Sequence, residues 1–181
     1  MQYGALVMVI VGVLVGTAFR NSRAESTTIT IPDQGWTLSF DSPSLEHFSG
    51  DAKGKDFVFN AADEGGFSLS IYVEEPKNAK TGHEACFDYY WPLAKRNPLI
   101  DAKSATIEKS DHFVKVSYNV TVSDGGEKTT VRNVNYYFAF QGRWVDVHVS
   151  RYLSGDDDAK LFDTFERSLT YKIAEAKEPG E

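Results

Sequence analysis

The chain has 181 residues, with 26 acidic and 19 basic side chains and a formal net charge of −7 at pH 7. This length is enough for one domain with its own hydrophobic core. The acidic balance and the lack of a basic stripe exclude a nucleic-acid-binding surface. The only cysteine, Cys86, cannot form a disulfide within the chain, so packing has to supply the stability.

An uninterrupted apolar run, Ala5–Phe19, lies near the N-terminus. Its length is typical of a signal-peptide core and falls short of the roughly 20 residues of a spanning helix. Small residues offer cleavage after Ala18 or Ala24. Because no basic residue precedes the run, a retained single-pass anchor stays open as the alternative. Residues 1–24 are therefore predicted to be a signal peptide or a membrane anchor. The expected location is extracytoplasmic, periplasmic or secreted, with membrane contact only through the apolar run.

The first part of the chain alternates between polar and apolar residues in short stretches. Residues 25–32 are polar and β-prone, which predicts a lead-in linker that ends in a strand. Residues 36–40 alternate as a strand. The polar stretch 44–56, rich in glycine and lysine, is predicted to be a loop. A hairpin of two strands is expected over 55–73, with its turn at residues 63–66.

A helix is predicted after this hairpin. Thr81 and Glu84 have the spacing of a capping box, which indicates a helix start at Thr81. Residues at helical spacing predict its buried stripe: Cys86, Tyr89, Tyr90 and Leu93. Asn97-Pro98 marks the end of the helix.

The second half of the chain is predicted to be strands followed by a helix. Alternation over residues 106–122 indicates a strand or a strand pair, and residues 131–151 form a long hairpin. A last helix begins near Asp156, where three consecutive aspartates suit the positive end of a helix dipole. Its predicted apolar stripe is Leu161, Phe162, Phe165 and Leu169. Residues 173–181 are expected to be disordered.

The long hairpin divides its side chains between two faces. With Gln141-Gly142 as a two-residue turn, residue 138 lies opposite 145 and residue 135 opposite 148. One face is apolar and is predicted to be core. The other is polar and aromatic, and we expect it to point away from the core. Its candidate binding residues, with two from neighbouring strands, are Tyr72, Asn119, Asn135, Tyr137, Trp144, Asp146 and His148. Rigid amphipathic rings favour a binding surface, although many antiparallel sheets simply solvate one face.

Three strands, a helix, three or four strands and a helix predict an α+β fold. Because the strands alternate, we expect one antiparallel sheet of six to seven strands with both helices on its apolar face. Residues 33–172 are predicted to form a single domain.

This element order, together with certain stretches, resembles the PsbP/Mog1-like superfamily. The stretches are GWTLSFDSP, KDFVFNAADEGGFSLSIYVEE, HFVKVSYNVTV and FDTFERSLTYK, and the resemblance covers most of residues 33–172. It implies a sheet packed with helices and a largely non-catalytic role. The chain differs from the superfamily's envelope lipoproteins because it lacks a lipidated cysteine.

No recognisable catalytic or metal-binding motif is present, so neither a metal nor a cofactor is predicted. His83 and Cys86 stand three residues apart on the predicted helix, which is the spacing of a metal or nucleophile pair, but a surface histidine beside a buried cysteine explains them as well. Ser44, Glu46 and His47 have the composition of a catalytic triad. Triads are assembled from distant positions, so closeness in sequence adds little.

The sequence predicts a non-catalytic binding or assembly module of the cell envelope with protein partners. One alternative is a carrier of a small ligand or lipid, with a pocket between sheet and helix. Another is an enzyme that uses Asp146 and His148 as an acid/base pair, since alternate residues of one strand share a face. A deep apolar cavity favours the carrier, and a cleft that contains both titratable residues favours the enzyme.

Overall fold

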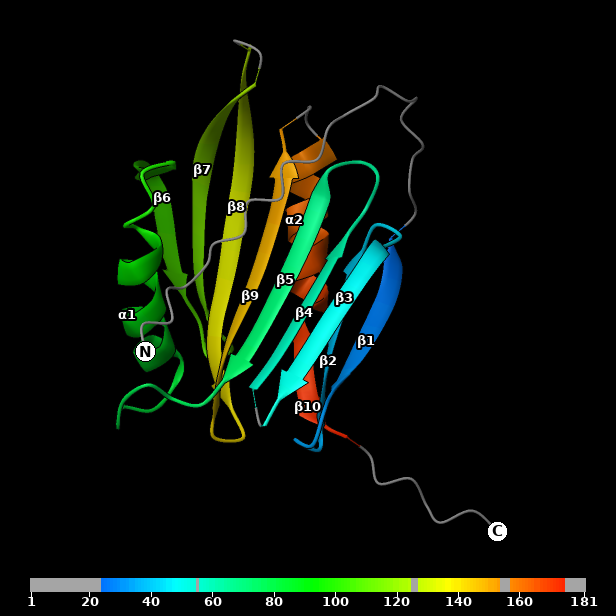
Figure 1. Ribbon diagram of the computed structural model, residues 1–181, viewed down its shortest axis with the longest axis vertical. Helices are drawn as coiled ribbons and strands as arrows, with labels where there is room; N and C mark the ends of the chain where they lie inside the picture. Colours follow the sequence, from blue (N-terminus) through cyan, green and yellow to red (C-terminus); the bar gives the residue numbers. More distant parts are fainter. Residues whose placement is uncertain (1–23, 55, 125–126, 154–156, 175–181) are drawn as a thin grey trace.

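The computed structural model describes residues 24–54, 56–124, 127–153 and 157–174 of the chain (Figure 1). Two helices and ten strands follow in the order β1 (Glu25–Ile31), β2 (Trp36–Ser42), β3 (Glu46–Lys53), β4 (Asp56–Ala62), β5 (Phe67–Glu74), α1 (His83–Ala94), β6 (Ile100–Lys109), β7 (Val114–Asp124), β8 (Glu127–Phe140), β9 (Arg143–Tyr152), α2 (Asp157–Ser168) and β10 (Thr170–Ile173).

The strands form two antiparallel sheets. The large sheet has seven strands in the order β3-β4-β5-β9-β8-β7-β6, and the small sheet has three in the order β1-β2-β10. The predicted register of the long hairpin is confirmed, because Phe138 pairs with Val145 and Asn135 with His148. The α+β class and the antiparallel pairing are therefore confirmed. The chain differs from the prediction in having a second sheet.

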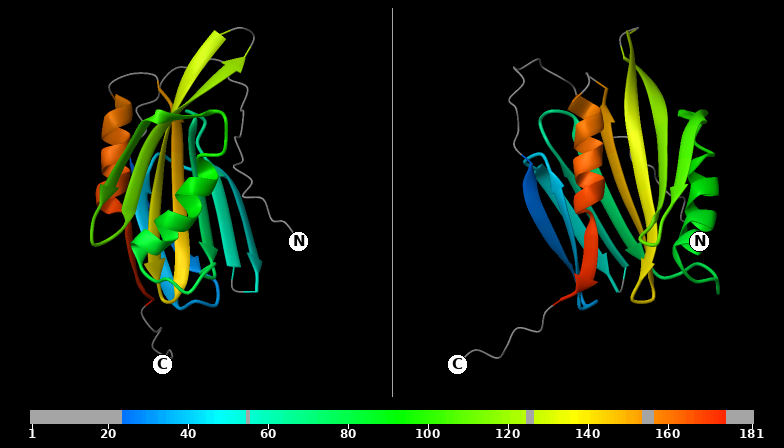
Figure 2. Two further views of the ribbon diagram at one scale, coloured as in Figure 1. Left: turned by 90° about the vertical axis from the view of Figure 1, so that its left-hand side faces the viewer. Right: turned by 180° about the vertical axis from the view of Figure 1, so that it is seen from behind.

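One face of the large sheet, which we call the inner face, packs against the small sheet and α2. Seen from behind, α2 and β10 lie in front of the large sheet (Figure 2). Phe165 of α2 contacts Phe40 of β2, Phe67 of β5 and Tyr136 of β8, with ring centroids 5.1, 6.3 and 5.7 Å away. The predicted stripe of α2 is confirmed, since Phe162, Phe165 and Leu169 are buried in this core.

The opposite face, which we call the α1 face, has a core of its own. Helix α1 contacts β8, β7 and β9 there. The buried residues of this second core include Ala85, Cys86, Trp91, Val116, Tyr118, Tyr137 and Trp144. The expectation that both helices cover one face is therefore wrong. Strands β8 and β9 present large apolar or aromatic side chains on both faces, and each helix covers a different face.

Several predicted boundaries change. The stretch 44–56, predicted to be a loop, contains β3, whose side chains are all exposed. An exposed edge strand needs no alternation, so the sequence shows no strand pattern there. Residues 25–32, expected to be a lead-in linker with a strand at its end, contain the seven-residue strand β1, which pairs with β2. Strand β10 was not expected.

Helix α1 begins differently from the prediction. Its N-cap is Gly82, with a positive φ of 88° and no side-chain cap, so Thr81 does not form the capping box. Of its predicted stripe, Cys86 is buried, while Tyr89, Tyr90 and Leu93 are partly buried. Pro92 lies within the helix, and the chain leaves it at Ala94. Asp156, the predicted start of α2, the tail beyond residue 174 and the apolar run Ala5–Phe19 lie outside the described residues.

Candidate functional site

Six of the seven predicted site residues share the α1 face. Cross-strand pairing aligns Tyr72 with Asp146 and Asp146 with Tyr137, and it aligns Asn135 with His148. Asn119 is an exception. It pairs with Arg132 beside Ser117, on the inner face, so its assignment to the polar face is wrong. Val116 and Tyr118 lie on the α1 face instead. The β7–β8 pairing has no bulge, so alternate residues of β7 stay on the same face along the whole strand.

The two aromatic residues of the predicted binding face are covered by α1. Tyr137 is fully buried, and Trp144 is 1% exposed. Trp144 packs against Tyr89 and Tyr90 of α1, with ring centroids 5.7 and 6.1 Å away, and Tyr137 stacks on Tyr90 at 6.3 Å. The prediction that these rings point away from a core is therefore wrong. They hold α1 in place and are closed to a ligand.

Asp146 is half-buried between Tyr72 and Tyr137 on the α1 face. The pKa of its carboxyl is raised to about 7. Loss of hydration is the main cause and the negative charge of Glu74 adds to it, while the hydrogen bond from Asn135 Nδ2 to Asp146 Oδ1, 2.7 Å long, lowers the pKa. The same loss of hydration, with the charge of Asp146 next, raises the pKa of Tyr72. The Asp146 carboxyl is therefore held in place by the Asn135 side-chain amide on the α1 face.

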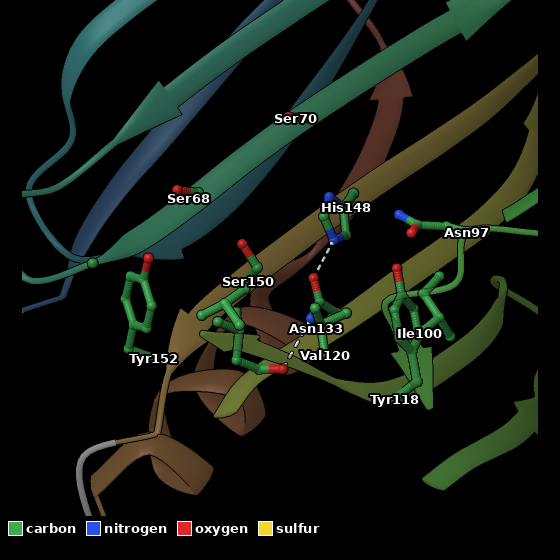
Figure 3. Close-up of a pocket in the computed structure, with 13 residues that line it drawn as sticks. Ser68, Ser70, Asn97, Ile100, Tyr118, Val120, Asn133, His148, Ser150 and Tyr152 are labelled. Carbon is green, nitrogen blue, oxygen red and sulfur yellow. Dashed lines mark hydrogen bonds between the residues drawn. The ribbon is translucent and has the colours of Figure 1, made fainter. Parts of the chain in front are cut away.

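Beyond the part of the sheet that α1 covers, the α1 face is hollowed into a pocket of about 60 Å³. Its floor is crossed by β5, β9, β8 and β7, and the connection from α1 to β6 forms one side (Figure 3). Its polar lining residues are Ser68, Ser70, Asn97, Tyr118, Asn133, His148, Ser150 and Tyr152. Its apolar lining residues are Ile100, Val120, Val122 and Val131, and Gly66 completes the rim.

His148 is the one predicted site residue that lines this pocket. Burial lowers the pKa of its imidazole to about 4, so the ring is neutral at pH 7. Its Nε2 lies 2.9 Å from Asn133 Oδ1, and Asn133 Nδ2 donates to the carbonyl of Val131 at 3.0 Å. Because that carbonyl only accepts, the Asn133 oxygen faces the imidazole, and Nε2 is the donor. The remaining nitrogen, Nδ1, is therefore an acceptor.

Other polar groups of the pocket keep hydrogen-bonding capacity for a ligand. Figure 3 shows the Asn97 carboxamide pointing toward His148 across the pocket, with the Tyr118 side chain beneath it. Within the described residues, no hydrogen bond is made by the hydroxyls of Ser68, Tyr118 and Ser150. Ser70, in contrast, donates to Asn60 Oδ1 at 2.8 Å.

Gly66 fixes the position of one pocket wall. Its φ is +85°, a conformation that favours glycine, and a Cβ at this position would lie 2.9 Å from the ring of Tyr152. The glycine therefore allows the Tyr152 ring to lie against the start of β5. Alternation along β5 puts Ser68 and Ser70 on the same face as Tyr72, but the sequence pattern gives no sign that a pocket joins them to Tyr118 and Tyr152. Only the pairing of four strands brings these residues together.

The other candidates from the sequence have structural roles. His83 Nδ1 accepts a hydrogen bond from the backbone N–H of Ala139 at 2.9 Å, and its Nε2 lies 3.1 Å from the carbonyl of Asp111. Cys86 Sγ lies 3.5 Å from the carbonyl of Val145, and burial raises the pKa of its thiol. The pair therefore joins α1 to the sheet. Ser44, Glu46 and His47 are all exposed, and no hydrogen bond links them in the described part of the chain.

Within residues 24–54, 56–124, 127–153 and 157–174, no cluster of three metal-ligating side chains is found. Over those same ranges, no helix combines the length and the apolar character that crossing a bilayer requires.

The chain matches no known protein family by sequence and no curated protein at a significant level. Among solved structures it is similar to LpqN of Mycobacterium tuberculosis, described as involved in cell envelope biogenesis, with 13% identity and a TM-score of 0.47 over 82% of this chain and 91% of LpqN. It is also similar to a protein of Bacteroides thetaiotaomicron VPI-5482, with 18% identity and a TM-score of 0.44 over 85% of this chain and 49% of that protein. The PsbP/Mog1-like resemblance is not confirmed by these matches.

Proposed function

We propose that the protein is a non-catalytic binding module outside the cytoplasm, and that it engages a protein partner through the pocket on the α1 face. The observation that supports this most directly is the pocket itself. It combines polar groups that lack partners with a position next to Leu99, which is 46% exposed. The side chains of a partner that contribute most to binding typically fill pockets of the opposite surface, and this pocket offers both apolar contact and hydrogen bonds.

The size of the pocket favours a protein partner over a carried ligand. Its volume of about 60 Å³ is well below the roughly 150 Å³ of an apolar cavity that holds benzene. A lipid chain or a ring-sized ligand would need more room than this pocket leaves. The end of a side chain from a partner needs less.

The arrangement of Asp146 and His148 supports a non-catalytic role. A general acid/base pair acts on a shared substrate, so both groups have to reach one site. His148 lines the pocket, whereas Asp146 bonds to Asn135 and is absent from the lining. The low pKa of His148 also makes it a weak base at neutral pH.

The apolar run Ala5–Phe19 supports a location in the cell envelope, either as an export signal or as an anchor. Mass measurement of the chain isolated from its native cells distinguishes the two. Cleavage after Ala18 or Ala24 gives a shortened chain, and an intact N-terminus indicates the anchor.

The test of function is cross-linking of the full chain in its native cells, followed by affinity capture and identification of the attached proteins. Ser150→Tyr fills the pocket, and Ser49→Tyr makes the same change on the exposed strand β3. We expect a partner that is captured by the wild type and by Ser49→Tyr and is lost with Ser150→Tyr. Equal capture by all three chains, or a small molecule that stays bound in native mass spectrometry, would contradict the proposal.

A further inference from the structure

We propose that the pocket on the α1 face receives an uncharged carboxamide, the end of an Asn or Gln side chain, from the protein partner. This inference rests on the proposed function, because it assigns the chemistry of the group that the binding module recognises. It follows from three properties of the pocket: its size, its lack of charge and the kind of hydrogen bonds that its lining leaves open.

Size limits the ligand to a few atoms. With roughly 15 Å³ needed for one water molecule, about 60 Å³ corresponds to about four waters. A carboxamide end of three or four heavy atoms replaces such a group of waters. A sugar ring or an aromatic ring does not fit within the same space.

The lining has no ionised side chain. Its polar members are serines, asparagines, tyrosines and His148, which is neutral at pH 7. A carboxylate or an ammonium group that entered would lose hydration without gaining an opposite charge, which is costly. The pocket therefore selects against charged side chains and accepts neutral polar ones.

The open hydrogen-bonding groups include both donors and acceptors. Asn97 Oδ1 accepts from the backbone N–H of Leu99 at 3.0 Å, so its amide nitrogen is left as a donor. Tyr118 contributes a further hydroxyl donor, and His148 Nδ1 is an acceptor. A carboxamide has two N–H donors and a carbonyl oxygen on one rigid plane, so it can bond to both kinds at once. A single hydroxyl has one donor and satisfies fewer of these groups.

Three small probes of the same shape test this assignment: acetamide, acetate and acetamidinium, which are neutral, negative and positive. Each is titrated to high millimolar concentration into the full chain at pH 7, with NMR detection of the His148 and Tyr118 side chains. We expect acetamide to shift both signals with millimolar affinity, since a ligand of four heavy atoms binds weakly at best. Acetate and acetamidinium are expected to leave them unchanged.

Variants show whether the shifts come from the pocket. Ser150→Tyr is expected to abolish the acetamide shifts, and Ser49→Tyr to preserve them. Tyr118→Phe removes one hydroxyl without adding atoms, so it tests the site even where Ser150→Tyr fails to fold. It is expected to weaken acetamide binding roughly 2- to 10-fold, the loss of one hydrogen bond.

The assignment is overturned if acetamide shifts neither signal, if acetate or acetamidinium shifts them as strongly, or if Tyr118→Phe binds acetamide as well as the wild type. The two proposals fail in different ways. If acetamide does not bind but Ser150→Tyr loses the captured partner, the carboxamide assignment is wrong and the proposed binding function is supported. If acetamide binds as expected but Ser150→Tyr captures the same partner as the wild type, the pocket is a carboxamide site and the proposed function is wrong.

Discussion

Asp146 lies between two tyrosines on the α1 face, and its surroundings favour the protonated carboxylic acid. The pKa of this carboxyl is raised from 3.8 to about 7, first by burial, so the folded chain binds a proton that the unfolded chain has lost between these two values. Its contribution to stability is therefore full below pH 3.8 and is lost as the pH rises through 7. Above pH 7, burial of the ionised group is a constant cost.

Replacement of this carboxyl by its neutral amide tests that cost. We expect Asp146→Asn to raise the free energy of unfolding by about 1–3 kcal/mol at pH 8 and to change it little at pH 4. The new amide oxygen can still accept from Asn135. Denaturant unfolding of both chains at the two pH values measures the difference. Asp88→Asn, on the exposed side of α1, is the matched control, and a loss of stability in Asp146→Asn at pH 8 would contradict the prediction.

Two stacked tyrosines at the contact between α1 and the sheet, Tyr90 of α1 and Tyr137 of β8, differ in whether their hydroxyls have partners. The Tyr137 hydroxyl is buried and has no hydrogen-bond partner within the described residues, whereas the Tyr90 hydroxyl donates to Glu74 Oε2. Removing an unsatisfied buried group recovers its desolvation cost. We therefore expect Tyr137→Phe to stabilise the fold by up to about 1 kcal/mol, and Tyr90→Phe to destabilise it by about 1 kcal/mol. Thermal or denaturant unfolding of the two variants shows whether their effects have opposite signs.

At the scale of elements, α1 is attached to the large sheet by aromatic rings, by Cys86 and by His83. The aromatic contacts of Trp144 and Tyr137 bury its inner side, and His83 bonds to the β8 backbone at Ala139 and to the connection between β6 and β7 at Asp111. The inner side of α2, in contrast, rests on Phe162 and Phe165 in the other core. The two helices can therefore loosen independently.

Loss of the His83 side chain is expected to loosen α1 alone. In His83→Ala the partly buried N–H of Ala139 loses its acceptor, which costs about 1 kcal/mol. Amide hydrogen exchange should become faster across His83–Ala94 and at Ala139, while α2 keeps its protection. His112→Ala, an exposed histidine on the connection between β6 and β7, is the control. Faster exchange in both helices would show that they unfold as one unit.

At the scale of the whole molecule, the large sheet is the middle layer between two cores. The small sheet and α2 cover its inner face, and α1 covers only part of the other. The pocket lies on the α1 face, just beyond the part that α1 covers. The side chains left there combine serine, asparagine, tyrosine and histidine with isoleucine and valine, and none of them is ionised. The overall acidic charge of the chain therefore says little about what the pocket binds.

Local pattern alone determined much of the fold. The Gln141-Gly142 turn, the pairing of the long hairpin and the stripe of α2 follow from interactions between residues close in sequence, so the sequence was enough to predict them. Strand β3 was missed because an exposed edge strand has no buried face to give it a period. The candidate site was predicted in part: His148 lines the pocket, whereas Trp144 and Tyr137 form a core.

Only the tertiary structure decided which face α1 covers. Alternation shows that two sets of side chains point in opposite directions, but it does not show what packs on each, because that depends on contacts between distant segments. Burial of Trp144 and Tyr137 by α1 turned most of the predicted binding face into a core, and the four-stranded floor joined Ser68, Tyr118, Ser150 and His148 into one pocket. The sequence by itself determined most of the strands and which of their residues share a face, and long-range packing decided which polar residues stay open to a partner.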